Sequence, residues 1–192
     1  FGFKSLVNGK DTLVGADIEL AKAIGEKLGV KVEFSVMSFD NVLANVQSGK
    51  ADIAIAGISV TDERKKVYDF SDSYYTSENV VIVKKDKVND YTSTDSLAKQ
   101  TVGTQKGSVQ ETVAKKQIPK ASVVSLASNG EMINELKSGQ LQAVVLEKAI
   151  AEGYIAQNDD LTLANFNLKS DGSDAYAVAT RKGSDDLLKE IN

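Results

Sequence analysis

The feature that most constrains the fold of this chain is a repeated alternation of helix, glycine and short apolar strand. Residues 45–57 (NVQSGKADIAIAG) and 133–147 (INELKSGQLQAVVLE) each read as a helix, a Ser-Gly pair and then an apolar strand. Strands that are apolar on both faces lie between layers of helices, and alternating strands and helices favour parallel sheets. The sequence therefore predicts an α/β fold with two similar units, each a parallel or mixed sheet flanked by helices.

Capping residues and apolar spacing locate the individual elements. We expect helices over 17–28, 40–48, 108–117, 129–138 and 147–157, with Asp17 and Ser108 as N-caps and glycines at the ends. We expect strands over 30–36, 52–58, 101–105, 122–126 and 141–146. Ligands of open α/β sheets bind at the carboxyl ends of the strands, which here are 57–59, 104–108, 126–129 and 146–147.

The composition excludes several kinds of chemistry. The chain has no Cys and no His, so thiol chemistry, the usual zinc ligands and the commonest general base are absent, and we expect no metal or cofactor. The net charge of −4, without a basic patch, argues against nucleic acid as a partner. The apolar runs, such as 79–83, are far too short to span a bilayer.

Arginine is rare in this chain, and its position after a predicted strand is informative. Arg64 is one of only two arginines among 23 basic residues. Thr61 can cap a short helix there, so Arg64 projects from a rigid turn at the ligand-binding end of the sheet. A guanidinium can bind a carboxylate through two parallel hydrogen bonds, which an ammonium cannot. Arg64 therefore either binds a ligand carboxylate or pairs with a nearby acid, Asp62, Glu63 or Asp69.

Three further positions have a binding interpretation and a structural one. The Gly107–Ser108 turn opens a helix whose first N–H groups can bind an anion, or it is an ordinary capped start. Glu147 follows a strand, where it either receives an ammonium group or is simply an acid at the N-terminus of the next helix, stabilised by the helix dipole. Phe39 either stacks on a ligand or packs as a hydrophobic staple. Combined with Arg64 and Ser59, the first two positions would bind a zwitterion, because buried charges require paired partners.

Three long segments resemble a known family. Residues 15–29 (GADIELAKAIGEKLG), 39–75 (from FDNVLANVQSGKADIAIAG to DFSDSYY) and 102–111 (VGTQKGSVQE) are similar to the amino-acid-binding proteins of bacterial ABC importers, the extracellular solute-binding proteins of family 3. The resemblance covers nearly the whole chain. It implies the two-lobed, type II periplasmic-binding-protein fold, or Venus flytrap, with two crossing strands. The implied boundaries are 1–78 and 175–192 for lobe 1 and 79–174 for lobe 2, with crossings near 76–80 and 172–176.

The same resemblance implies a role for each candidate site residue. Arg64 would hold the ligand α-carboxylate with help from Ser59, and the Gly57 carbonyl would accept from the α-amino group. From the other lobe, the N–H groups of Ser108 and Val109 would donate to the carboxylate and Glu147 would meet the ammonium. The side-chain pocket would contain Phe39, Gln105 and Gln110.

Three departures from the family pattern are visible. Glu147 stands where the family more often has Asp, and Ala16 stands where it usually has Phe. The first strand of lobe 1 is expected to precede Phe1, and further helices are expected beyond Asn192, so the chain is expected to lack both.

The function implied by the resemblance is binding rather than catalysis. The chain would be the substrate-binding component of an ABC transporter that delivers a polar L-amino acid to membrane permease subunits. The amide and aromatic candidates favour glutamine or arginine. Its location would be the periplasm or the outer face of a Gram-positive membrane, as a lipoprotein that meets the membrane only through its anchor or the permease.

Two other functions use the same fold. One is a ligand-binding domain of a sensor or receptor. The other is a dehydratase of the cyclohexadienyl type, which needs a positioned proton donor, whereas the only evident acid in the predicted pocket is Glu147.

Overall fold

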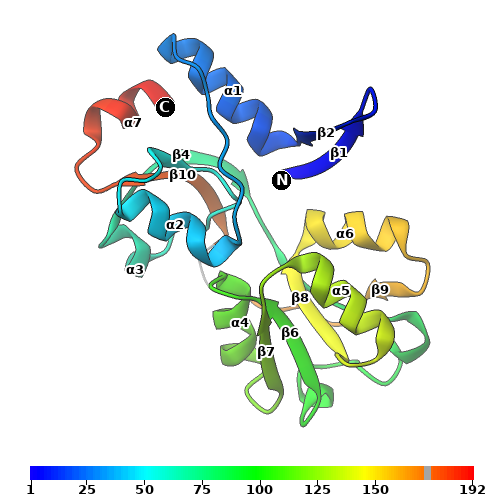
Figure 1. The fold of residues 1–192 in the computed structure, drawn as a ribbon. Coiled ribbons are helices and arrows are strands. Elements are labelled where there is room, and N and C mark those ends of the chain that lie inside the picture. Colours follow the sequence, from blue (N-terminus) through cyan, green and yellow to red (C-terminus); the bar gives the residue numbers. More distant parts are fainter. Residues whose placement is uncertain (171–173) are drawn as a thin grey trace. The chain divides into compact units, whose positions relative to one another are not determined.

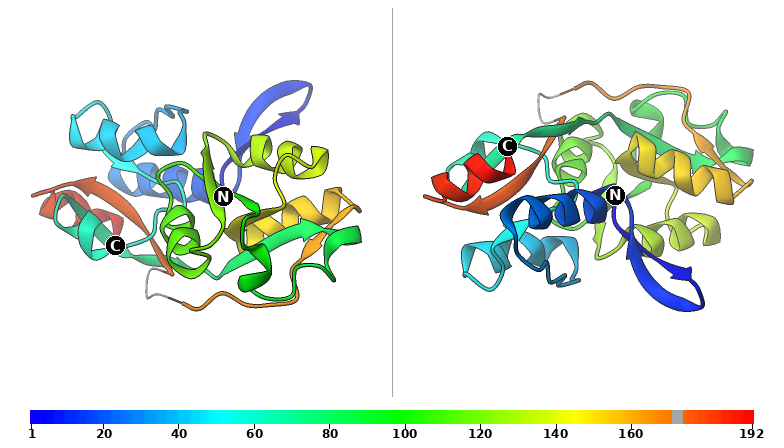
Figure 2. Two further views of the ribbon diagram at one scale, coloured as in Figure 1. Left: turned by 90° about the horizontal axis from the view of Figure 1, so that it is seen from below. Right: turned by 90° about the horizontal axis from the view of Figure 1, so that it is seen from above.

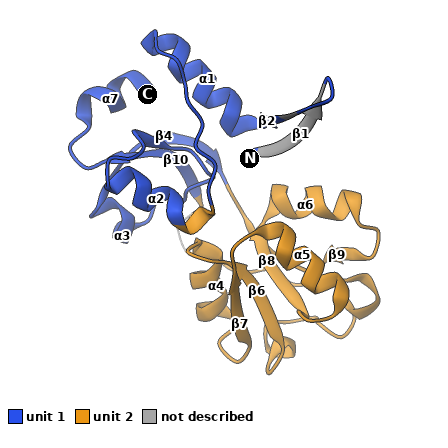
Figure 3. Ribbon diagram, in the orientation of Figure 1, with its two compact units in different colours: residues 1–37, 41–76, 175–192 blue, residues 38–40, 77–174 orange. Residues whose placement is uncertain are grey.

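The computed structural model describes residues 1–170 and 174–192, and the side chains of these residues except 3–7 and 11. The chain forms two compact units (Figure 3): unit 1 contains residues 1–37, 41–76 and 175–192, and unit 2 contains residues 38–40 and 77–174. The predicted second crossing, 172–176, falls partly on residues 171–173, outside the described part.

Unit 1 contains most of the first third of the chain and its last eighteen residues (Figure 1). Its elements are β1 (Phe3–Val7), β2 (Lys10–Val14), α1 (Ala16–Leu28), most of α2 (Phe39–Gln47), β3 (Ile53–Ala54), α3 (Asp62–Lys65), β4 (Tyr68–Thr76), β10 (Ala175–Arg181) and α7 (Asp185–Ile191). β1 and β2 form an antiparallel hairpin, and β3, β10 and β4 form a second antiparallel sheet in that order.

Unit 2 is a five-stranded mixed sheet with helices on both faces. Its elements are β5 (Asn79–Lys84), η1 (Lys85–Lys87), η2 (Asp95–Leu97), β6 (Thr101–Gln105), α4 (Val109–Gln117), β7 (Ser122–Leu126), α5 (Asn129–Ser138), β8 (Ala143–Glu147), α6 (Lys148–Gln157) and β9 (Leu161–Leu163). The strand order is β7-β6-β8-β5-β9, with β6 parallel to β7 and β8, and β5 antiparallel to its two neighbours. The predicted α/β fold class is confirmed, although the described sheets of unit 1 are antiparallel.

Two apolar clusters fix the layers of unit 2. On one face of the sheet, α5 and α6 bury Met132, Leu136 and Ala151 against the strands. On the other face, Ala114 of α4 and Ile118, the residue after that helix, pack with buried strand residues. The chain after β9 runs along one side of this unit in both views of Figure 2 and adds side chains to the second cluster. The carboxyl ends of β6 and β8 therefore stand on a rigid, fully packed layer.

The predicted strand over 30–36 is wrong. Residues 30–38 form neither helix nor strand, and the side chains of Phe34 and Val36 are 40% and 63% exposed. Apolar alternation alone does not make a strand, because a strand also needs a neighbour to complete its hydrogen-bond ladder. Val32 packs instead on α1, where a Cβ added to Gly25 would lie 2.3 Å from Val32 Cγ2. Glycine at position 25 therefore permits this close approach.

The helix ends follow the predicted capping residues with one exception. Thr61 Oγ1 accepts from Arg64 N at 3.1 Å, and Ser108 Oγ accepts from Glu111 N at 3.4 Å. Gly29, in the left-handed conformation, closes α1 as predicted. Asp17 does not cap α1, because the N-cap position is Gly15 and no side chain caps that end. The prediction for Asp17 is therefore wrong, and its carboxylate is used elsewhere.

The hairpin at the start of the chain is not among the predicted elements. Its two-residue turn is Asn8-Gly9, with φ angles of 51° and 76°. An Asn-Gly pair is the strongest short sequence signal for such a turn, so the sequence contained the information.

Candidate functional site

The turn that contains the predicted carboxylate-binding residues is held firmly against β10. Ile58 O accepts from Ala177 N at 3.1 Å, and Val60 N donates to Ala175 O at 3.0 Å. Ser59, between them, forms an isolated antiparallel bridge with Tyr176 and is 1% exposed. The backbone from 58 to 60 thus behaves as a short extra strand on the edge of the sheet.

Arg64 is half-buried and directed back toward this turn. Its Nη1 donates to the carbonyl oxygen of Ser59 at 2.8 Å. Burial lowers the pKa of Arg64, and interactions with Tyr68 and Tyr176 oppose that shift. An arginine side chain remains charged in proteins regardless. The structure therefore holds a partly desolvated cation at the end of the turn, where an anion would be favoured.

Two of the three acids proposed as alternative partners of Arg64 are engaged by lysines. Asp62 lies 3.7 Å from Lys65 Nζ, and Asp69 lies 3.0 Å from Lys182 Nζ. These contacts make Asp62 and Asp69 weaker candidates for the partner of Arg64. Binding of a ligand carboxylate by Arg64 stays a prediction.

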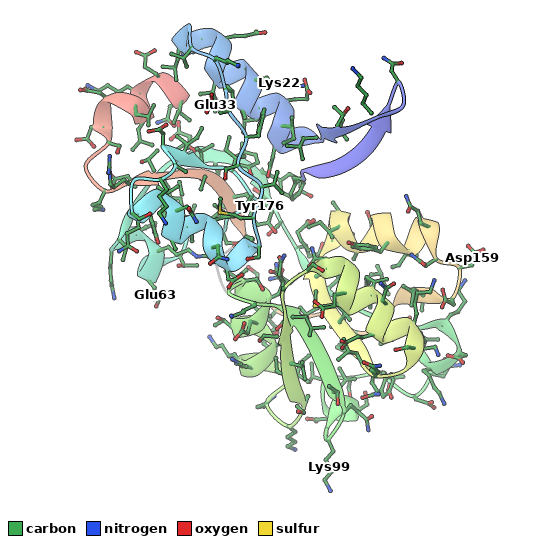
Figure 4. All side chains as sticks on the ribbon, viewed as in Figure 1. Lys22, Glu33, Glu63, Lys99, Asp159 and Tyr176 are labelled. Carbon is green, nitrogen blue, oxygen red and sulfur yellow. The ribbon has the colours of Figure 1, made fainter. Side chains whose placement is uncertain are left out.

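An aromatic cluster that the sequence analysis missed lies beside Gly57. The Phe1 ring lies 4.8 Å from the Tyr75 ring and 5.6 Å from the Tyr176 ring, and the two tyrosines are 5.7 Å apart. Gly57 has φ 59°, and a Cβ there would lie 3.1 Å from Tyr176 Cε2. Tyr176 is labelled in Figure 4 and is 3% exposed. These rings come from three distant segments, so local patterns could not group them.

Asp17, which the sequence analysis predicted as the N-cap of α1, has a buried side chain instead. Its side chain is 4% exposed, and its Oδ1 accepts from the Tyr74 hydroxyl at 3.0 Å. Burial raises the pKa of Asp17, and the hydrogen bond from Tyr74 opposes that rise. The burial of Asp17 indicates a role other than capping the helix, and the sequence alone does not show that burial.

In unit 2, the turn after β6 presents the start of α4. Ser108 Oγ donates to Gln105 O at 2.6 Å, and Ser108 N donates to the same oxygen at 3.2 Å. Glu111 Oε2 accepts from Gly107 N at 3.2 Å, so the acid of the predicted capping box serves Gly107. The first N–H groups of an α-helix have no partner within the helix, and Val109 begins α4. The Ser108 N–H is already engaged by Gln105 O, and anion binding by Ser108 and Val109 stays a prediction.

Glu147 ends β8 and is almost completely buried, at 2% exposure. Its Oε2 accepts from Ala149 N at 2.8 Å and from Ile150 N at 3.2 Å, so Glu147 is the N-cap of α6. This establishes the structural interpretation of Glu147. A carboxylate accepts several hydrogen bonds at once, so the capping role is compatible with binding an ammonium, which stays a prediction.

The remaining predicted pocket residues are Gln110, Gln105 and Phe39. Gln110 Nε2 donates to Asn79 Oδ1 at 2.8 Å, so its amide is engaged within unit 2. Gln105 and Phe39 are half-buried, and Phe39 is the first residue of α2. Thr104, next to Gln105, is fully buried, and its hydroxyl has no hydrogen-bond partner among the described residues. Contact of these side chains with a ligand stays a prediction.

Metal binding and membrane spanning were also assessed. Among the side chains that the structure describes, no group of three or more potential metal-ligating residues lies together. Within the same residues, no helix combines the length and apolarity needed to cross a bilayer.

Comparison with known proteins identifies the family. The profile of bacterial extracellular solute-binding proteins, family 3, matches residues 2–192. The arginine-binding extracellular protein ArtP of Bacillus subtilis is 36% identical over 180 residues, covering 91% of this chain and 69% of ArtP. The arginine-bound crystal structure of the amino acid ABC transporter substrate-binding protein AbpA from Streptococcus pneumoniae has a TM-score of 0.96 and 52% identity, covering 100% of this chain and 80% of that one.

A further structural relative carries a different ligand. An ancestral arginine-binding protein bound to glutamine has a TM-score of 0.90 and 43% identity, covering 100% of this chain and 83% of that one. With the family match, the likeness to these type II periplasmic-binding-protein structures establishes the lineage of this chain. The chain belongs to the bacterial extracellular solute-binding proteins of family 3.

Proposed function

We propose that this protein is the substrate-binding component of an ABC transporter and that it binds L-arginine, with L-glutamine as a weaker ligand. It binds without chemical turnover and delivers the amino acid to membrane permease subunits. The observation that carries the proposal is the half-buried guanidinium of Arg64, held at the end of the turn while Asp62 and Asp69 pair with lysines. Such a cation is suited to a carboxylate.

The two units supply complementary groups for the two charges of an amino acid. Unit 1 provides Arg64 for the carboxylate and the Gly57 carbonyl for the ammonium. Unit 2 provides the start of α4 at Ser108 and Val109 for the carboxylate, and Glu147 for the ammonium. We propose that lobe 1 (1–78 and 175–192) and lobe 2 (79–174) close on one ligand and exclude water, which strengthens each charge contact.

The preference for arginine rests on the relatives. ArtP is named for arginine, and AbpA was crystallised with it. The ancestral protein bound to glutamine argues for a second, related ligand. Phe39 offers a face on which a guanidinium or an amide can stack, and Gln105 and Gln110 offer hydrogen-bonding groups. The proposed location is the periplasm or the outer face of a Gram-positive membrane, consistent with an extracellular solute-binding family.

Isothermal titration with arginine and two analogues tests the proposal. Agmatine lacks the carboxylate that Arg64 is proposed to bind, and N-acetyl-arginine lacks the ammonium proposed for Glu147. We expect arginine to bind and each analogue to bind at least tenfold more weakly, because each leaves a buried charge unpaired. Equal binding of agmatine and arginine would contradict the role of Arg64. Binding of neither arginine nor glutamine would contradict the proposed function.

A further inference from the structure

We infer that Asn79 is a positioning residue that fixes the side chain of Gln110 and thereby favours an amino acid whose side chain is rich in hydrogen-bond donors. The inference deepens the proposed function and rests on it, because Gln110 is proposed as a pocket residue. Asn79 itself touches no ligand in this account. It acts through the Gln110 amide, at the end of the sheet where Glu147 is also proposed to bind.

The hydrogen bond between the two side-chain amides is the central observation. Gln110 Nε2 donates to Asn79 Oδ1 at 2.8 Å. Gln110 lies in the first turn of α4 and is 9% exposed, whereas Asn79 is the first residue of β5. The bond therefore joins the start of a helix to a strand 31 residues earlier in the chain, and it orders an amide that is almost buried.

Strand pairing places this hydrogen bond beside Glu147. Asn79 lies directly opposite Glu147 in the antiparallel pair of β5 and β8. Residues opposite one another in such a pair project from the same face of the sheet, with Cβ atoms about 5 Å apart. Asn79 and Glu147 therefore form, with Gln110, a polar group at the carboxyl end of β8.

The polar side chains are confined to this end of the face. Two residues further along β5 and two residues earlier in β8, the same face carries Val81 and Val145, which belong to the apolar cluster under α4. Thr104 lies two residues after Val102 of that cluster and is fully buried, and its hydroxyl has no hydrogen-bond partner among the described residues. Buried hydroxyls are nearly always hydrogen-bonded, so this end of the sheet has capacity for a partner that solvent or a ligand supplies.

The hydrogen bond to Asn79 decides which atom of Gln110 is presented to a ligand. Nε2 is directed to Asn79, so Oε1 lies on the other arm of the planar amide, and within the described part of the chain no residue donates to it. A carbonyl oxygen only accepts hydrogen bonds, and the nitrogens of a guanidinium only donate them. A fixed Gln110 therefore suits the side chain of arginine. An amide free to turn would present its donors or its acceptor and would discriminate less.

Arginine and citrulline are the pair of ligands that separates these two cases. Citrulline has nearly the same shape, but a carbonyl oxygen replaces one terminal nitrogen and the side chain is uncharged. Opposite a fixed acceptor that oxygen has no donor, so the parent chain should bind arginine about tenfold or more tightly than citrulline. The ratio of the two affinities reports the orientation of the Gln110 amide, whereas a variant that only loosens the fold weakens both ligands alike.

The test measures both ligands by isothermal titration on Asn79→Ala, on Gln110→Ala and on the double variant. We expect Asn79→Ala to lower the arginine-to-citrulline ratio about fivefold, because the released amide can turn its donors toward citrulline. In the Gln110→Ala background, Asn79→Ala should change the ratio no further, since Asn79 acts through Gln110. Gln142→Ala is the matched control, because Gln142 Oε1 accepts from Thr101 N at 2.8 Å just before the start of β8. Its loss should leave the ratio unchanged.

Asn79→Leu replaces Asn79→Ala if the latter does not fold, because leucine fills a similar volume without an acceptor and should lower the ratio in the same way. An unchanged ratio in the folded Asn79 variant, or a parent chain that binds citrulline as tightly as arginine, would overturn the inference while the proposed function stands. Independent, additive effects in the double variant would also overturn it. A parent chain that binds neither arginine nor glutamine would contradict the proposed function itself, and the inference with it.

Discussion

Arg64 Nη1 donates to the main-chain carbonyl of Ser59 at 2.8 Å, five residues earlier in the chain. In the same turn, Thr61 caps the short helix that carries Arg64, because Thr61 Oγ1 accepts from Arg64 N at 3.1 Å. The guanidinium is therefore oriented by its own turn, before any ligand binds. A side chain ordered in advance loses less conformational entropy on binding.

Glu147 is expected to have two separable roles. In Glu147→Gln, one side-chain oxygen can still accept from Ala149 N and Ile150 N, so the α6 cap should survive and the melting temperature should change little. The charge for the ligand ammonium is lost, and we expect arginine affinity to fall about tenfold or more. Titration calorimetry and thermal melting measure the two effects.

Glu147→Ala provides the comparison for this pair of effects. It removes the cap as well as the charge, and should cost about 0.5–2 kcal/mol of stability in addition to affinity. If Glu147→Gln bound arginine as tightly as the parent chain, Glu147 would be a cap only.

Adding a single methyl group at two glycines of unit 2 should change the stability in opposite directions. A Cβ at Gly103 in β6 would lie 2.6 Å from Leu141 Cδ1, whereas nothing lies within 4 Å of a Cβ at Gly153 in α6. Gly103→Ala should lose about 1–3 kcal/mol in urea unfolding, because the packed layer must shift. Gly153→Ala should gain about 0.5–1 kcal/mol, because alanine is the better helix former. Equal effects at both sites would contradict the packing of this sheet.

Asp69 should make unit 1 more stable above about pH 4 than below it. The hydrogen bond from Lys182 and the N–H of Gly183, 2.8 Å from Oδ2, lower the pKa of Asp69 below the ordinary 3.8. A lowered carboxyl pKa contributes stability that is complete above the unfolded value and is lost as the pH falls through the folded value. Melting temperatures between pH 2 and 7 should therefore fall less steeply on acidification for Asp69→Asn. Parallel curves for the two chains would show that Asp69 does not contribute.

Much of the fold could be predicted because its signals are local. Capping residues such as Thr61 and Ser108 and the left-handed glycine at position 29 depend on a few neighbouring residues. The strand predicted over 30–36 failed because strand formation depends on a partner elsewhere. The sheet of unit 1 is antiparallel because β10 enters it from the far end of the chain, which helix–strand alternation does not reveal.

In the candidate site, too, residues with a local sequence signal were identified and residues without one were missed. The type and position of Arg64 left two interpretations open, a carboxylate-binding residue or a partner of a nearby acid, and the family resemblance implied the first. The lysine partners of Asp62 and Asp69 account for two of the three acids. Asp17 was read as a cap, because its burial and its contact with Tyr74, 57 residues away, have no local signal. The cap formed by Glu147 follows from its place before α6.

The most direct test of the account is arginine binding by Arg64→Lys, with Arg181→Lys as its matched control. Lysine keeps the charge but cannot form the two parallel hydrogen bonds to a carboxylate. Arg181, the other arginine of the chain, is exposed at the end of β10. By titration calorimetry we expect Arg64→Lys to bind L-arginine roughly thirtyfold or more weakly, and Arg181→Lys to bind it as the parent chain does. Equal affinity of Arg64→Lys and the parent chain would contradict the proposal that Arg64 holds the ligand carboxylate.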